Sequence, residues 1–222
     1  MTGASTDTRT STSTSTRLRG AAVLALPALL IACALYWSAP AALADVRVLQ
    51  ARAEVAHWRA NGITPGPAQW RADLDALTDS LARGPANAQT HEDIAYLYAL
   101  RGAAALAYPK VATPMLEQAL GHYESAAALR PLSSSSWASV ALARHYLRRD
   151  EAALWFAFDR AMAYGPNEPH TQPTLFFIGL QRWAMLDPAR RDALRAALSR
   201  AQPPLREQLA QLAREGGHPE LK

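Results

Sequence analysis

The stretch that decides the fold covers residues 126–172 and reads AAALRPLSSSSWASVALARHYLRRDEAALWFAFDRAMAYGPNEPHTQ. Two of its prolines, Pro131 and Pro166, lie 35 residues apart. Ala126 and Ala161 each precede one of these prolines by five residues. A period of about 34 residues is typical of the tetratricopeptide repeat, in which two helices form a hairpin and successive hairpins stack. The stretch therefore predicts stacked antiparallel helix hairpins.

Small and aromatic side chains in this pattern are the ones that pack the two helices of a hairpin together. A small alanine lets two helices approach closely, and an aromatic ring about one turn away fills the groove beside it. We expect this repeat packing to involve Ala119, Tyr123, Ala126, Pro131, Trp137, Phe158, Ala161 and Pro166. An ordinary helical bundle, which also places alanine and aromatic residues at helical spacing, is the alternative.

The composition supports an all-α body. The 222 residues include 48 alanines but only six valines and four isoleucines, which favours helices and argues against a large sheet. Proline, glycine and capping residues divide the body into helices joined by short connections. The expected helices cover about residues 45–59, 67–83, 90–107, 114–130, 137–149, 150–165, 171–186, 188–203 and 204–216.

Two of these boundaries depend on capping residues. Thr90 resembles the first residue of a capping box, because Asp93 follows three positions later. Thr113 precedes Pro114, and a cap followed by proline at the first helical position predicts a helix start. Pro85 and Pro131 lie 46 residues apart, about a dozen more than the repeat period. Residues 108–114 are then expected to form a loop that holds part of this extra length.

The first 44 residues are expected to lie outside the helical body. Residues 1–19 are predicted to be a disordered cytoplasmic tail, because they consist largely of low-complexity serine and threonine. Residues 20–44 are predicted to be a transmembrane signal anchor, because the run is apolar and long enough to cross a bilayer as a helix. The tetratricopeptide-like domain then covers residues 45–217, and residues 218–222 form a C-terminal tail.

The orientation of the span follows from the arginines before it. Arg9, Arg17 and Arg19 precede the apolar run, so the positive-inside rule places the N-terminus in the cytoplasm and the body across the membrane. Two alternatives stay open. The run is also compatible with a signal peptide cleaved after Ala44, and the residues up to Cys33 resemble the lipidation site of a bacterial lipoprotein.

The chain resembles the VpsP-type family of bacterial exopolysaccharide-biosynthesis proteins. The resemblance rests on Leu129-Arg130-Pro131, Trp137-Ala138, Ala141, Phe156, Phe158, Gly165-Pro166-Asn167-Glu168-Pro169, Gly179-Leu180 and Trp183, and on Trp58-Arg59-Ala60 and Pro67-Ala68-Gln69-Trp70 nearer the membrane. Asn167 departs from the family, in which tryptophan is expected there. The resemblance implies a single-span protein of the bacterial inner membrane with a periplasmic body, and a non-enzymatic accessory role in polysaccharide assembly or export.

No motif for catalysis, a cofactor or a metal is recognisable in the sequence. The six histidines include no His-x₃-His or His-Glu-x-x-His pair, and a single cysteine excludes a multi-cysteine zinc site. His91, beside Glu92 and Asp93, is interpreted as part of a solvated first helical turn, and a weak metal site is the alternative. The aromatic group Trp155, Phe156 and Phe158 is interpreted as core packing of a repeat helix. We therefore expect no enzymatic activity and no cofactor.

The charge pattern favours a protein partner over nucleic acid. Residues 45–222 hold 20 basic and 18 acidic residues, which leaves no electrostatic footprint for nucleic acid. The densest basic group consists of Arg144, Arg148 and Arg149, whose guanidinium groups can hold a carboxylate. Our hypothesis is that this group binds another protein of the polysaccharide machinery. The alternatives are a glycan-binding or glycan-modifying periplasmic module, and a lipoprotein assembly factor.

Overall fold

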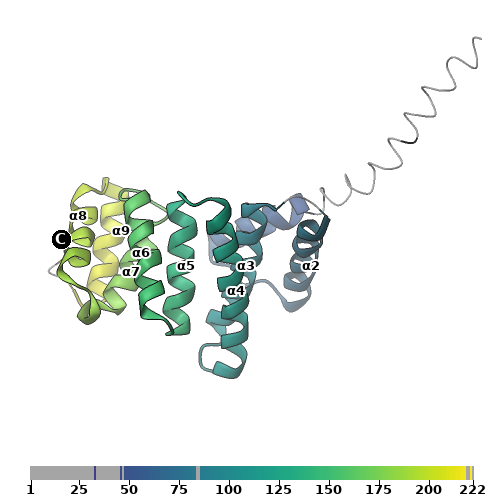
Figure 1. Cartoon of the computed structure of the whole chain (residues 1–222), viewed down its shortest axis with the longest axis horizontal. Coiled ribbons are helices and arrows are strands. Elements are labelled where there is room, and N and C mark those ends of the chain that lie inside the picture. The colour runs from purple at the N-terminus through teal and green to yellow at the C-terminus, as the bar shows by residue number, and fades with distance from the viewer. Residues whose placement is uncertain (1–32, 34–45, 47, 84–85, 219–220, 222) are drawn as a thin grey trace, which may run out of the picture. The chain divides into compact units, whose positions relative to one another are not determined.

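The computed structural model describes Cys33, Val46, residues 48–83 and 86–218, and Leu221. These residues form helices and the turns between them, and none of them lies in a β-strand (Figure 1). The predicted all-α class is therefore confirmed. Residues 48–222 form a compact unit of their own.

The predicted tail (1–19) and span (20–44) lie outside the described residues, apart from Cys33, which is exposed and forms no disulfide. In the part of the chain that the structure describes, no helix is both long enough and apolar enough to cross a membrane. The anchor, the cleavage after Ala44 and the lipidation of Cys33 therefore stay predictions.

The helices of the compact unit follow one another at short intervals. The first covers residues 48–61. After it come α2 (Pro67–Arg83), α3 (Ala88–Ala104), α4 (Pro109–Leu129), α5 (Ser134–Leu147), α6 (Glu151–Tyr164), α7 (Gln172–Gln181), the short 3-10 helix η1 (Trp183–Met185), α8 (Pro188–Arg200) and α9 (Pro203–Glu215).

Side-chain caps account for several of these starts. The Asp150 carboxylate accepts a hydrogen bond from the Ala153 amide at 3.0 Å and so begins α6, as the sequence predicts. The start of α3 differs from the prediction. Asn87 is its N-cap, and the Asn87 side chain accepts from the amides of Gln89 and Thr90. Thr90 therefore lies inside the first turn and is buried.

The start of α4 is the main correction to the predicted boundaries. Residues 108–114 do not form a loop, because α4 begins at Pro109 and Thr113 and Pro114 lie inside it. Proline is favoured at the first helical position, where its missing N–H would have no partner in any case. Pro109 meets this condition earlier than Pro114. Only residues 105–108 connect α3 to α4. The extra residues between Pro85 and Pro131 therefore belong mainly to these two helices.

The C-terminal part differs from the prediction in two ways. The predicted helix to residue 186 is divided into α7 and η1 at Arg182. The predicted tail from residue 218 also contributes to the domain, because the apolar side chain of Leu221 is buried in the core and His218 packs its ring against Trp183 with the centroids 4.8 Å apart. An apolar residue near a chain end gains stability by such burial.

Alternate helices of the unit contact each other as well as their chain neighbours. Each helix from α2 to α9 packs against the next, and in addition α3 contacts α5, α5 contacts α7 and α7 contacts α9. Figure 1 shows the helices in chain order from α2 to α7, followed by α8 and α9. The odd-numbered helices from α3 onward therefore form a connected series.

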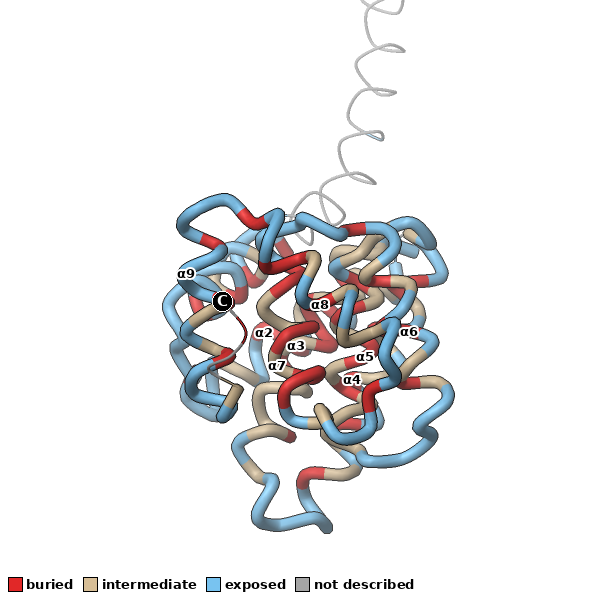
Figure 2. The backbone as a smooth tube through the Cα atoms, turned by 90° about the vertical axis from the view of Figure 1, so that its left-hand side faces the viewer, coloured by how far each residue is buried: buried red, intermediate tan, exposed pale blue. Residues whose placement is uncertain are grey.

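The core lies where the helices face one another, as the buried residues in Figure 2 show. One hydrophobic cluster joins residues 48–61, α2 and α3, and a larger one runs from α3 to the C-terminal end. Tyr98 on α3 packs against both clusters. Phe158 and Phe176 are the largest side chains that are fully buried.

The ends of α4 and α6 have the same backbone conformation, 35 residues apart. The C-cap of α4, Arg130, has φ −130° and ψ 69°, and the C-cap of α6, Gly165, has φ −139° and ψ 59°. Each cap amide donates to the carbonyl of the alanine four residues earlier, at 2.9 Å for Ala126 and 3.0 Å for Ala161. Both alanines are fully buried, as predicted.

The other residues predicted to pack the repeat differ in their burial. Ala119 and Phe158 are fully buried, and Tyr123 is buried. Trp137 is half-buried, whereas Pro131 and Pro166 lie in the exposed turns that follow the two caps.

Gly165→Ala should destabilise the protein although the backbone angles at this position suit alanine. A β-carbon at position 165 would lie 2.5 Å from Cβ of Ser134, which belongs to the first turn of α5 and cannot move aside freely. We expect a loss of about 1–2 kcal/mol in the free energy of unfolding, measured by urea titration.

Gly121→Ala is the control, because no atom outside its own stretch of helix would lie within 4 Å of its new methyl group. This change in the interior of α4 should add roughly 0.5–1 kcal/mol. Losses of similar size from both variants would contradict the packing at Gly165.

Candidate partner-binding surface

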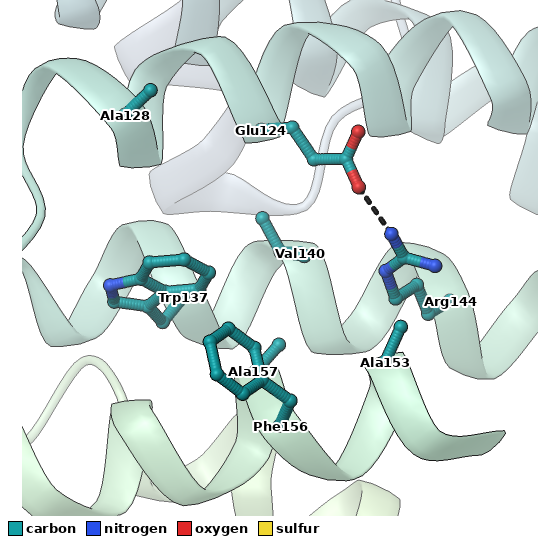
Figure 3. Close-up of a pocket in the computed structure, with 8 residues that line it drawn as sticks. All are labelled: Glu124, Ala128, Trp137, Val140, Arg144, Ala153, Phe156 and Ala157. Carbon is teal, nitrogen blue, oxygen red and sulfur yellow. Dashed lines mark hydrogen bonds and ion pairs between the residues drawn. The ribbon is translucent and has the colours of Figure 1, made fainter. Parts of the chain in front are cut away.

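A pocket of about 270 Å³ opens between α4, α5 and α6. The sequence places its lining at helical spacing, because Trp137, Val140 and Arg144 follow one face of α5. The pocket is lined by Glu124, Ala128, Trp137, Val140, Arg144, Ala153, Phe156 and Ala157 (Figure 3). The alanines from α4 and α6 are small and leave the pocket open. The aromatic rings provide its apolar surface, and Glu124 and Arg144 provide its charged groups.

Two aromatic rings line the pocket, and a cation lies over both of them. Trp137 and Phe156 meet edge to face, with their centroids 5.8 Å apart. The Arg160 guanidinium lies 5.0 Å from the Trp137 ring centroid and 4.6 Å from that of Phe156. The Trp137 indole N–H donates to the Pro131 carbonyl at 2.8 Å, which orients the ring. We call Trp137, Phe156 and Arg160 the aromatic patch.

The aromatic patch is exposed where an apolar ring would ordinarily be buried. Phe156 exposes 52% of its surface. Leu129 at the end of α4 and Leu132 in the turn before α5 are also exposed. Arg160 takes part in none of the ion pairs among the described residues. A cation without a carboxylate partner therefore lies beside apolar side chains that face solvent.

Charged groups close one end of the pocket. Arg144 forms an ion pair with Glu124 of α4, drawn in Figure 3, and its guanidinium also lies 3.6 Å from the carboxylate of Asp150. The Arg144 side chain is largely buried, whereas Glu124 is about half exposed. This arrangement fixes the position of α5 against α4 and gives the pocket a polar boundary.

The three arginines predicted to bind a partner have different surroundings. Arg144 pairs with Glu124, and Arg149 pairs with Glu117 at 2.6 Å, so both connect the end of α5 to α4. Arg148 is exposed and forms the left-handed C-cap of α5 with φ 52°. Partner binding by this group stays a prediction.

His145, the next residue of α5 after Arg144, points about a quarter turn away from the pocket and contacts α7. Its Nδ1 accepts a hydrogen bond from Nε of Arg182 at 3.0 Å, and Arg182 also forms an ion pair with Glu151. Burial, and to a smaller extent the nearby guanidinium groups of Arg182 and Arg148, lower the pKa of His145 to about 4. The imidazole is therefore neutral near pH 7, as the hydrogen bond requires.

This neutral histidine should make stability depend on pH. An unfolded chain takes up the proton near the ordinary pKa of 6.5, whereas the folded chain takes it up near 4. The unfolded state thus binds more protons between these values, so the free energy of unfolding should fall as the pH falls from 6.5 to 4. Urea titrations at about pH 7 and about pH 4.5 should show a larger loss for the wild type than for His145→Gln. An equal or larger loss in the variant would contradict this assignment.

The sequence interpretation missed the aromatic patch. It assigned Phe156 to the core together with Trp155 and Phe158, but only Phe158 is fully buried, and Trp155 is half-buried. One signal was available: Phe156 and Phe158 are two residues apart on one helix, so they cannot share a face. Arg160 follows Phe156 by four residues and therefore does share its face.

No known protein family, no curated protein and no solved structure matches the chain.

Proposed function

We propose that this chain is a membrane-anchored, tetratricopeptide-like scaffold that holds another protein during bacterial exopolysaccharide biosynthesis or export, and that it makes and breaks no bonds itself. The aromatic patch is the observation that carries the binding proposal. The connected series from α3 to α9 and the matching ends of α4 and α6 support a stack of helix hairpins, an α-solenoid. Such stacks present extended surfaces that suit protein binding.

The chemistry of the patch defines the partner. Exposed aromatic and arginine side chains are enriched at protein interfaces and dominate their energetics. The pocket beside Phe156 has room for one apolar side chain, and the unpaired Arg160 favours a carboxylate next to it. The partner is therefore a protein segment in which an aliphatic or aromatic residue lies close to an acidic residue.

A glycan is the less favoured ligand for this surface. Sugar rings stack on exposed aromatic faces, but the guanidinium of Arg160 already covers one face of Trp137 and one face of Phe156. The carboxylate in the pocket, on Glu124, is paired with Arg144. The arrangement therefore suits a protein segment with an apolar residue next to an acidic one. The pocket has no free pair of carboxylates for glycoside hydrolysis.

The cellular setting of the proposal comes from the sequence. The apolar run at residues 20–44 supports a single span of the bacterial inner membrane, and the arginines before it support a cytoplasmic N-terminus and a periplasmic body. The resemblance to the VpsP-type family supports the exopolysaccharide pathway.

Site-specific cross-linking tests the proposal. A photo-activatable phenylalanine analogue would replace Phe156 in the full-length chain, in cells that make the polysaccharide. We expect a cross-linked adduct with one protein, and Arg160→Gln should remove most of it because the carboxylate loses its cation. The same analogue at Tyr108, an aromatic residue that is 71% exposed on α4, is the matched control and should not give this adduct. An adduct with polysaccharide, or an adduct that Arg160→Gln leaves unchanged, would contradict the proposal.

A further inference from the structure

Two histidines from neighbouring helices meet with their ring nitrogens facing each other. His91 lies in the first turns of α3, and His122 lies in the C-terminal half of α4. Their Nδ1 atoms are 3.0 Å apart, and their ring centroids are 5.2 Å apart. Since the nitrogens are so much closer than the centroids, both Nδ1 atoms lie between the rings. The sequence interpretation of His91 as a solvated residue did not foresee this pairing, because the partner is 31 positions away.

The surroundings favour the neutral, metal-binding form of both rings. Burial lowers the pKa of His91, and burial together with the nearby His91 lowers the pKa of His122. Tyr98 stacks on His122 with an interplanar angle of 16°, which restricts the rotation of that ring. Both histidines are only half-buried, so an ion can reach them from solvent. Neutral imidazole is the form that binds metal ions.

We propose that His91 and His122 form a binding site for a divalent transition-metal ion, with zinc as the most suitable. A tetrahedral zinc ion, with each nitrogen about 2.0–2.1 Å away, holds two ligand nitrogens about 3.3–3.4 Å apart. The present separation of 3.0 Å needs only a small outward rotation of one ring. The ring that now donates from Nδ1 carries its hydrogen on Nε2 in the bound form, so the change of tautomer releases no proton.

The site supplies two protein ligands. Among the described residues, no group of three or more histidine, cysteine, aspartate or glutamate side chains converges to hold a metal. The remaining coordination positions are therefore left to water or to an external ligand. Two-ligand coordination implies weaker binding than a closed structural zinc site, and it leaves the ion accessible. Bound metal would connect α3 to α4 at the end of the hairpin away from residues 105–108 and would stabilise the folded state by mass action.

Metal titration of the purified full-length chain tests the site, and it does not depend on the proposed scaffold function. We expect zinc chloride and nickel chloride to raise the melting temperature in a saturable manner, with one ion bound per chain by calorimetric titration. His91→Gln and His122→Gln should each weaken binding by roughly tenfold or more, because one of the two ligand bonds is lost. Glutamine can keep a hydrogen bond to the other histidine, so the fold is expected to remain, as circular dichroism would check.

His170→Ala is the matched control, because His170 is exposed and lies in the turn before α7. It should bind metal as the wild type does. Absence of saturable binding by the wild type would overturn the proposal. So would binding of equal strength in folded His91→Gln and His122→Gln chains.

Discussion

Phe158→Ala is expected to lower the free energy of unfolding by about 3–5 kcal/mol, the range for removing a large aromatic side chain from a packed core. Phe158 is fully buried within the larger hydrophobic cluster, and its ring meets Trp155 edge to face with the centroids 5.5 Å apart. Deleting the ring removes these contacts and leaves a cavity that the rigid helices around it can fill only in part. The measurement is chemical unfolding followed by far-ultraviolet circular dichroism.

Phe156→Ala is the matched control for this loss. Phe156 is the same residue type on the same helix, two positions away, and more than half of its surface is exposed. Its replacement should change the free energy of unfolding by about 1 kcal/mol or less, mainly through the lost contacts with Trp137 and Arg160. Losses of equal size from the two variants would contradict the assignment of Phe158 to the core and Phe156 to the surface.

Ala161→Leu and Ala126→Leu are expected to cost about 1–3 kcal/mol each by overpacking. Both alanines are fully buried at the ends of hairpins, where a small side chain lets the helices approach. A leucine in their place would push neighbouring side chains out of favoured rotamers or force the helices apart. Thermal and urea unfolding would measure both losses.

The controls lie two residues further along each helix. Ala163 and Ala128 are exposed, so Ala163→Leu and Ala128→Leu should change the free energy of unfolding by less than about 0.5 kcal/mol. The comparison holds the residue type, the helix and the substitution constant. If the substitutions at the two exposed alanines lower the free energy of unfolding as much as those at the two buried alanines, the predicted register of the repeat is wrong.

The ends of α4 and α6 could be predicted because small and rigid residues mark them. Two prolines 35 residues apart, each with a small alanine before it, predicted where hairpins end, and the matching dihedral angles of Arg130 and Gly165 appear at those positions. Helix type was predictable for the same reason: an alanine-rich chain with few β-branched residues has a strong preference for helix.

The start of α4 could not be predicted from local signals alone. Both Pro109 and Pro114 are compatible with a first helical turn, and Thr113 resembled a cap more closely than Tyr108. Tertiary packing decides between them, because a start at Pro109 brings Ala112 into the helix and buries it. Local sequence patterns do not show which of these residues tertiary packing will bury.

The candidate site depended even more on three-dimensional contacts. Phe156 and Arg160 share a face of α6 by their spacing, but their meeting with Trp137 requires α5 and α6 to pack together. The hypothesis for Arg144 and Arg149 considered their charge and could not include Glu124 and Glu117, which lie 20 and 32 residues earlier.

The central claim is that the aromatic patch docks a partner of a non-catalytic scaffold. The most direct measurement is polysaccharide output, together with the abundance of this chain, in cells that carry Phe156→Ala with Arg160→Gln in place of the wild type. We predict lost or strongly reduced output at unchanged abundance, because the substitutions alter the exposed surface and leave the core intact. The control is Tyr108→Ala with Arg214→Gln, an exposed aromatic and an exposed arginine elsewhere on the unit, which should leave output unchanged. Normal output from the patch variant at normal abundance would contradict the account.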